Sequence, residues 1–181
     1  NPRWVFPSYY YTWTKPVDSR TTIQFVYIDT VVLSGNSDVH HPTTHELIRE
    51  LHGSELPGPD DQSMADAQLD WLSQTLAAST ADYLIVAGHY PVYSVCEHGP
   101  TTALVKRVKP LLEAHHVTAY LNGHDHCEQH LQERTGGVDY HTVGSAAIND
   151  ASMAHAANVP PGSLKFHSPG TLGGLASVPV T

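Results

Sequence analysis

Two apolar runs, each followed by Gly and His, constrain this chain more than any other feature. Residues 84–91 read Leu-Ile-Val-Ala-Gly-His-Tyr-Pro, and residues 119–126 read Ala-Tyr-Leu-Asn-Gly-His-Asp-His. Continuous apolar runs bounded by Gly and Pro are typical of strands that are buried on both faces of a sheet. Because ligands bind beyond the carboxyl ends of such strands, we expect His89, His124 and His126 to meet at one edge of a sheet. Neutral imidazole is a common ligand of Zn, Fe, Cu and Ni, so the pattern predicts a metal site.

The remaining hydrophobic patterns alternate between strands and helices. We expect strands over residues 9–14, 23–29, 83–88, 117–122, 128–134, 138–143, 163–167 and 174–180. We expect one helix to begin at Ser63 as its N-cap, and a second over residues 101–115 that Pro110 kinks or shortens. Residues 128–143 should form a hairpin that turns at residues 135–137. This order predicts a layered α/β domain that comprises residues 1–181.

Residues 34–62 form a long polar segment that contains several His, Gly and Pro residues. Within it, residues 44–51 are expected to form a short helix. Loops of this length in compact domains are usually lids, other functional loops or disordered segments. We therefore expect residues 34–62 to be a mobile surface loop over the site, and proteases to cut there first.

The amino-acid composition limits which molecules this chain can bind. The chain of 181 residues has 9 Lys and Arg against 18 Asp and Glu, a net charge of −9. This balance argues against nucleic-acid binding, and no apolar stretch is long enough to span a membrane. The 14 His outnumber Lys and Arg combined, so mild acid would reverse the sign of the net charge. That property suits an acidic working environment.

Three segments carry a resemblance to a known family. They are Gly-His-Tyr-Pro-Val at residues 88–92, Glu-His-Gly-Pro-Thr at residues 97–101 and Gly-His-Asp-His at residues 123–126. Together they resemble the purple acid phosphatases, of the small tartrate-resistant type, within the calcineurin-like metallophosphoesterase superfamily. Further similar landmarks extend the resemblance over nearly the whole chain.

The resemblance implies a fold. The family's α/β metallophosphoesterase fold has two mixed β-sheets packed face to face with flanking helices. This chain is expected to supply about the carboxy-terminal half of that fold. The resemblance also implies a location in the extracellular space or in the lysosomal or vacuolar lumen, as for secreted glycoproteins, although the chain contains no Asn-x-Ser/Thr sequence.

The resemblance also implies a chemistry. Members hydrolyse phosphate monoesters at acidic pH, at a dinuclear centre of Fe(III) with Fe(II), Zn(II) or Mn(II). Two such metals lower the pKa of a bound water and stabilise both ends of an in-line displacement. By resemblance, His89 and His124 are ligands of the divalent metal, and His126 is a ligand of the ferric ion. His98 contacts the phosphate and protonates the leaving group, and Glu97 orients His98.

The chain lacks several metal-ligand motifs of the family. The family's upstream Asp, Asp-x-x-Tyr and Gly-Asn-His-Asp motifs do not occur. Three imidazoles without a bridging carboxylate do not hold the family's centre. We therefore expect a partial or truncated form that is inactive alone and is completed by a missing amino-terminal half.

The cysteines differ as well. Ser34 and Ala103 stand where the mammalian-type enzymes are expected to have a Cys pair. If the three His share one site, the loops with Cys96 and Cys127 are neighbours, and we predict a disulfide between them. The alternative is two free cysteines, one of them a metal ligand.

Two other functions fit the same residues. One is a non-catalytic extracellular or structural protein built on this fold, because fold and motif remnants do not guarantee activity. The other is a His-rich metal-binding module. For His98, the alternative is a structural residue that caps the helix that follows it.

Overall fold

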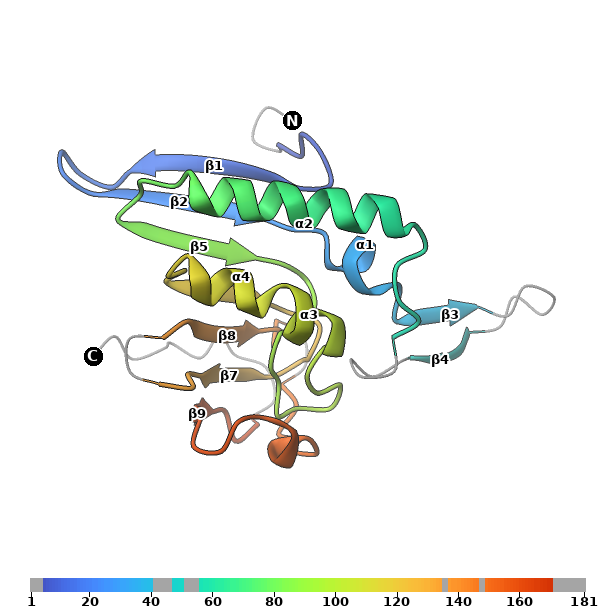
Figure 1. The fold of residues 1–181 in the computed structure, drawn as a ribbon. Helices are drawn as coiled ribbons and strands as arrows, with labels where there is room; N and C mark the ends of the chain where they lie inside the picture. The colour runs from blue at the N-terminus through green and yellow to red at the C-terminus, as the bar shows by residue number, and fades with distance from the viewer. Residues whose placement is uncertain (1–4, 41–46, 51–55, 135–136, 147–148, 171–181) are drawn as a thin grey trace.

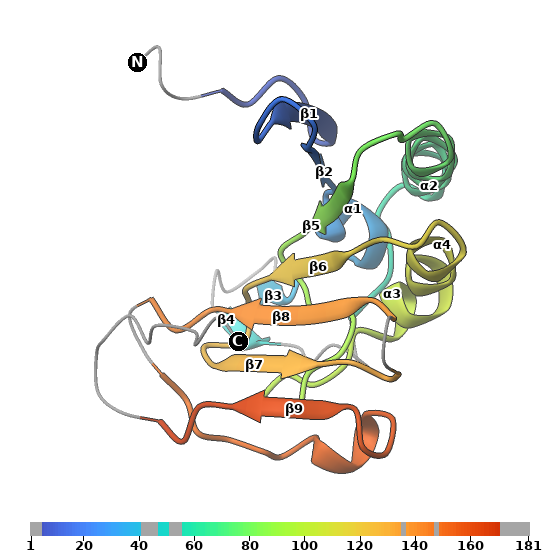
Figure 2. The same cartoon turned by 90° about the vertical axis from the view of Figure 1, so that its left-hand side faces the viewer.

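The computed structural model describes residues 5–40, 47–50, 56–134, 137–146 and 149–170. Seven strands form one mixed sheet in the order β1-β2-β5-β6-β8-β7-β9 (Figure 2). They are β1 (Tyr11–Pro16), β2 (Thr22–Tyr27), β5 (Tyr83–Ala87), β6 (Ala119–Asn122), β8 (Asp139–Val143), β7 (Glu128–Leu131) and β9 (Leu164–His167). The four strands β2, β5, β6 and β8 are parallel, so their carboxyl ends lie at the same edge of the sheet. The outer strands β1, β7 and β9 pair antiparallel with their neighbours.

Three helices cover one face of this sheet (Figures 1 and 2). They are α2 (Gln62–Ala77), α3 (Thr102–Arg107) and α4 (Lys109–Ala114). The core fills the space between helices and sheet, and its fully buried side chains include Val26, Leu72, Val86, Leu104, Leu112 and Tyr120. The sheet and its helices agree with the predicted α/β metallophosphoesterase fold. In the described part of the chain, no helix has the length and apolar character needed to cross a bilayer.

Helix ends follow local chemistry that the apolar pattern does not specify. Helix α2 is capped by Asp61, whose carboxylate accepts hydrogen bonds from the backbone N–H groups of Ser63 and Met64, so the predicted Ser63 cap is wrong by two residues. The predicted helix over residues 101–115 divides at Val108, between α3 and α4. Pro110 has no N–H to donate and restricts the residue before it, which is the expected cause of the break.

The strand predicted over residues 23–29 ends early, at Tyr27. A short helix, α1 (Thr30–Ser34), follows it, and the Asp29 side chain caps this helix by accepting from the N–H groups of Val31 and Val32. Asp29 is thus a cap and not the last residue of the strand. The edge strand expected over residues 9–14 is displaced along the chain to β1.

The long segment 34–62 contains regular structure. Strands β3 (Asp38–His40) and β4 (Leu47–Glu50) pair antiparallel as a separate two-stranded sheet. The short helix expected over residues 44–51 is therefore wrong at residues 47–50. Residues 41–46 and 51–55 lie outside the described residues, as do residues 135–136 of the predicted turn and the strand expected over 174–180.

The irregular stretch expected over residues 145–162 contains one short 3₁₀ turn, η2 (Ala156–Asn158). Its first residue donates its backbone N–H to Met153, and the preceding His155 donates its N–H to the carbonyl of Val95. This second bond ties the stretch to the loop after β5.

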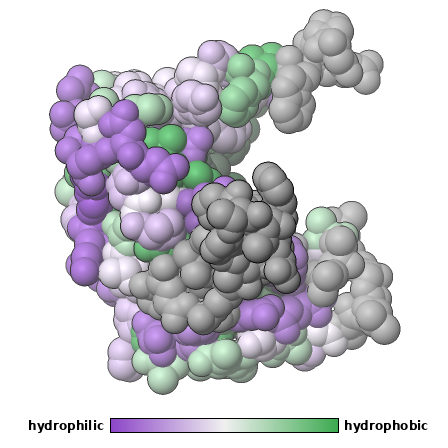
Figure 3. Space-filling model, turned by 90° about the vertical axis from the view of Figure 1, so that its right-hand side faces the viewer, coloured by the Kyte–Doolittle hydropathy of each residue, from purple (hydrophilic) through white to green (hydrophobic). Residues whose placement is uncertain are grey.

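The second face of the sheet carries none of the described helices (Figure 2). Because side chains alternate along a strand, this face receives the residues between the buried ones of each strand. One row crosses the sheet in register: Tyr11, Tyr27, Ala87, Leu121, His141, His130 and Phe166. Figure 3 shows the molecule from one side, with a concave outline there. Along the row, the side chains are polar on β7 and β8, at His130 and His141, and aromatic on β1 and β2, at Tyr11 and Tyr27.

Candidate metal centre

Two Gly-His loops leave adjacent parallel strands and bond to one another. The Gly88 N–H donates to Leu121 O at 3.0 Å, and the Gly123 N–H donates to His89 O at 3.1 Å. Gly88 is required by packing, because a Cβ there would lie 2.6 Å from Thr30 Cγ2 and 2.7 Å from the Tyr120 hydroxyl. The apolar runs of the sequence thus place both loops at one sheet edge, as predicted.

The imidazoles gather around His124. The ring centroid of His124 lies 5.1 Å from that of His89 and 4.4 Å from that of His98. His124 is buried, whereas His89 and His126 are exposed. Its φ of +66° places its backbone in the left-handed region, which a non-glycine residue rarely adopts. Such local strain is concentrated at functional sites, which makes His124 a candidate site residue.

The electrostatic environment favours the neutral form of two of these rings. Burial and the neighbouring rings of His98 and His89 lower the pKa of His124 to about 3. Partial burial of the His89 ring, which removes water from it, and the charge of His126 together lower the pKa of His89 below its usual value. Neutral imidazoles are the form that binds metal ions.

The donor set fits metal ligation in one specific respect. The Nε2 atom of His124 is buried and has no hydrogen-bond partner among the described residues. An unpaired buried polar atom is costly unless another ligand satisfies it. His89, His124 and His126 do not, however, form a described group whose ligand atoms all lie within 4.8 Å of one another. The three rings therefore do not form one compact three-ligand site as they stand in this structure.

A buried aspartate, which the sequence analysis did not single out, supports His98. Asp125 is fully buried, and its Oδ1 lies 2.6 Å from His98 Nδ1 and accepts the His98 backbone N–H at 2.8 Å. The Ser94 hydroxyl donates to its other oxygen. Burial raises the pKa of the Asp125 carboxyl, but the hydrogen bonds from His98 and Ser94 outweigh it, so the net pKa is lowered.

Further buried polar groups hold this aspartate loop in place. The Gln129 amide donates to Ser94 Oγ at 2.7 Å and to Thr142 Oγ1 at 3.0 Å, and its oxygen accepts the Val95 N–H. Gly144 fits against the loop because a Cβ there would lie 1.8 Å from Asp125 O. The site thus rests on a satisfied polar network that links β7, β8 and both loops.

Glu97 is placed differently from the expectation. Its side chain is exposed, and its backbone carbonyl is 3.0 Å from His155 Nε2. The carboxylate on Nδ1 of His98 is that of Asp125. The sequence feature that could have pointed to Asp125 is its position between two histidines of the Gly-His-Asp-His segment. A carboxylate there can accept a hydrogen bond from a third imidazole.

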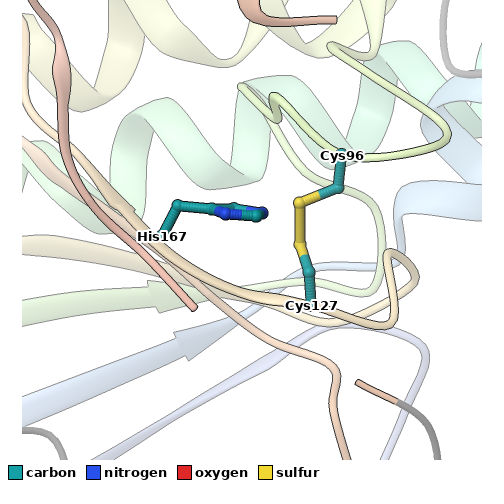
Figure 4. A group of neighbouring side chains, drawn as sticks. All are labelled: Cys96, Cys127 and His167. Atoms are coloured by element: carbon teal, nitrogen blue, oxygen red, sulfur yellow. A yellow bond between two sulfur atoms is a disulfide. The ribbon is translucent and has the colours of Figure 1, made fainter. Parts of the chain in front are cut away.

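Cys96 and Cys127 are joined by a disulfide, with their Cα atoms 6.7 Å apart. Figure 4 shows this bond crossing between the two loops, with the ring of His167 pointing toward it. The Nε2 atom of His167 is buried without a hydrogen-bond partner among the described residues. The bond ties the loop of His98 to the loop of His126.

We expect the double substitution Cys96→Ala/Cys127→Ala to lower the free energy of unfolding by about 3–4 kcal/mol. The bond closes a loop with a sequence separation of 31, and its removal frees the unfolded chain. Urea unfolding with and without a thiol reductant measures the loss. The reductant should shift the wild-type midpoint and leave the variant unchanged. Two thiols labelled per chain in unfolded, unreduced protein would contradict the bond.

Comparisons with known proteins point to one family. The family described as Calcineurin-like phosphoesterase matches residues 7–128. The chain is 44% identical over 181 residues to tartrate-resistant acid phosphatase type 5 of Rattus norvegicus, and the match covers 98% of the chain and 52% of that protein. The same enzyme of Homo sapiens is 42% identical over 182 residues, covering 99% of the chain and 52% of the enzyme. The chain thus spans about half the length of the curated relatives it matches.

Solved structures share the fold. The structure described as GAP50, the anchor in the inner membrane complex of Plasmodium, has a TM-score of 0.67 and 23% identity, covering 92% of this chain and 46% of that chain. Purple acid phosphatase PPD1 from yellow lupin has a TM-score of 0.50 and 13% identity, covering 81% of this chain and 25% of that chain. The family match spans more than half of the sequence and includes both Gly-His loops, and the chain therefore belongs to the calcineurin-like phosphoesterase family.

Proposed function

We propose that this chain is the carboxy-terminal part of an acid phosphatase that hydrolyses phosphate monoesters at a dinuclear metal centre. The observation that carries the proposal is the close approach of His89 and His98 to a buried His124 whose Nε2 has no hydrogen-bond partner among the described residues. The similarity to tartrate-resistant acid phosphatases over nearly the whole chain supports it.

The residues have separate roles in this proposal. His89 and His124 would hold a divalent ion, which is Fe(II), Zn(II) or Mn(II), and His126 would hold Fe(III). Metals bound there would lower the pKa of a water molecule and neutralise charge on the phosphoryl group. The carboxylate and Tyr ligands that complete such a centre come from an amino-terminal half that this chain does not contain.

His98 acts on the ester itself. The carboxylate of Asp125 only accepts hydrogen bonds, so it assigns the Nδ1 proton to His98 and fixes the ring. Nε2 is then the nitrogen that binds the phosphate and gives a proton to the departing alkoxide. Asp125 is a positioning residue in this step, and Glu97 stays a prediction as a second influence on His98.

We expect His98→Ala, in the protein that includes the missing half, to lower kcat by about 10–100-fold, because the metals still act while the proton donor is lost. The loss should be largest for alkyl phosphates, whose leaving groups most need a proton. Rates on alkyl and activated aryl phosphates, with metal content measured in parallel, test this. Full kcat on alkyl phosphates, or loss of metal, would contradict the role and favour a structural His98.

Partly exposed aromatic side chains on β1 and β2, on the sheet face that carries none of the described helices, indicate that a further part of the fold packs there. Tyr11 stacks on Tyr27 with ring centroids 4.7 Å apart, and Trp13 stacks on Phe25 at 6.0 Å. Trp13 nevertheless remains 51% exposed. Large exposed apolar patches usually mark contact surfaces, and the amino-terminal half of the same fold is the partner that we propose for this one.

The disulfide and the His content support a location outside the reducing compartments. A disulfide persists in secreted and lumenal proteins, and 14 His suit a protein that works at acidic pH. We therefore propose secretion or a lysosomal or vacuolar lumen as the location.

The function is tested by metal dependence in the longer form of the protein. Removal of metal with a chelator should abolish hydrolysis of an aryl phosphate at pH 5, and Fe with Zn should restore it. A longer form that carries the upstream ligands, binds metal and yet shows no turnover would support the non-catalytic alternative on the same fold.

A further inference from the structure

A second group of metal-ligating side chains lies outside the Gly-His loops, on the sheet face away from the helices. It consists of His130 on β7 and Asp139 and His141 on β8. One ligand atom from each residue lies within 4.8 Å of the other two. The other described group of this kind is Cys96, Cys127 and His167, but its sulfur atoms are bonded to each other and provide no thiolate.

The antiparallel register of β7 and β8 brings the three residues together. His130 and His141 are direct partners across the two strands. Asp139 precedes His141 by two residues and so lies on the same face of the sheet. Cross-strand partners and their diagonal neighbours are close enough for side chains to meet. The rings of His130 and His141 are stacked, with centroids 4.4 Å apart and planes at 17°.

The carboxylate is held in place by two neighbours. Asp139 Oδ1 lies 2.6 Å from His130 Nε2, and the same oxygen accepts a hydrogen bond from Gln132 Nε2 at 2.9 Å. Hydrogen bonds of this kind orient ligands in metal sites. The side chains of His130 and Asp139 are 29% and 31% exposed, so an ion from solvent can reach them in the 181-residue chain.

The charge balance also suits a cation. Burial and His130 lower the pKa of His141, against the opposing influence of Asp139. A neutral His141 has a lone pair for a metal ion, and the Asp139 carboxylate adds negative charge beside it.

We propose that His130, Asp139 and His141 bind a late first-row divalent cation, with Zn(II) as the probe, at a site separate from the Gly-His loops. Two imidazoles and one carboxylate are a ligand set that such ions accept, and water fills the remaining position. Metal–ligand distances of about 2.0–2.2 Å require the ligand atoms to close around the ion, which small side-chain rotations between adjacent strands allow. Hard ions such as Mg(II), which prefer oxygen, do not fit this set.

The experiment counts bound Zn(II) in the full chain after metal has been removed, by titration against a coloured competing chelator. Wild-type protein is compared with His141→Asn, Asp139→Asn and Gln132→Ala. The matched control is His116→Asn, because His116 is an exposed histidine in neither described metal-ligating group. All variants retain the His residues of the Gly-His loops, so any difference reports on the second site.

We expect His141→Asn and Asp139→Asn each to lose one bound equivalent of Zn(II). Gln132→Ala should weaken that equivalent by about 10–100-fold, the usual effect of losing a group that orients a ligand. His116→Asn should match wild type. Unchanged stoichiometry and affinity in His141→Asn would overturn the proposal.

A second measurement separates loss of the site from loss of the fold. Each metal-free variant should unfold at the wild-type temperature, and Zn(II) should raise that temperature less in the site variants than in the control. Should His141→Asn fail to fold, Asp139→Asn decides the question, because it keeps the shape of the side chain. If a folded Asp139→Asn variant still bound the full amount of Zn(II), the Asp139 carboxylate would not be a ligand. That result would overturn the proposed site.

Discussion

Replacing His124 with Asn is expected to remove metal from the Gly-His loops and to abolish phosphatase activity in the longer form of the protein. Asn tolerates the left-handed backbone at this position, so the change removes the imidazole and spares the turn. Metal-ion catalysis supplies several kcal/mol of transition-state stabilisation, so the rate should fall by at least about 1000-fold. Elemental analysis and rates on an aryl phosphate measure the two effects.

The control is the same change at the other left-handed histidine. His116 has a φ of +52°, is exposed and lies outside the site. His116→Asn should retain both metal and activity. Wild-type metal content in His124→Asn would show that the buried Nε2 of His124 is not a ligand.

Replacing Asp125 with Ala is expected to lower the free energy of unfolding by about 3–5 kcal/mol. The change leaves the Nδ1 and backbone N–H of His98, and the hydroxyl of Ser94, without their buried acceptor. Few single changes in this chain should destabilise it more, because the carboxylate is fully buried and accepts from three groups. Chemical unfolding of the variant and the wild type measures the difference.

Asp66→Ala is the matched control for this stability measurement. Asp66 also accepts hydrogen bonds, from Gln62 and Arg107, but it lies exposed on the surface of α2. Exposed ion pairs contribute little to stability, so this variant should unfold close to wild type. Equal losses in the two variants would contradict the role assigned to the buried network.

Much of the fold was predictable because its central strands are continuous apolar runs. The runs that end before Gly88 and Gly123 became β5 and β6, and their parallel pairing placed His89 and His124 at one edge. A run of this kind has few alternatives to a buried strand, so both the strands and the meeting of the two loops followed from the sequence.

Other features depended on contacts that local patterns do not encode. Residues 47–50 have no decisive periodicity, and pairing with β3 made them a strand where a helix was expected. Ser63 and Asp61 are both good cap residues, and the geometry of the chain entering α2 selected Asp61. The role of Asp125 depends on His98, which is distant in sequence and was paired with its neighbour Glu97 in the sequence analysis.

The most direct test of the account compares two forms of the protein in one assay. The 181-residue chain, and the same chain joined to the amino-terminal half that we propose, are each supplied with Fe and Zn and assayed on an activated aryl phosphate at pH 5. We expect turnover of about 1 s⁻¹ or more for the completed protein, in the usual range of enzymes, and background hydrolysis for the chain alone. Full turnover by the chain alone, or none by the completed protein with metal bound, would contradict it.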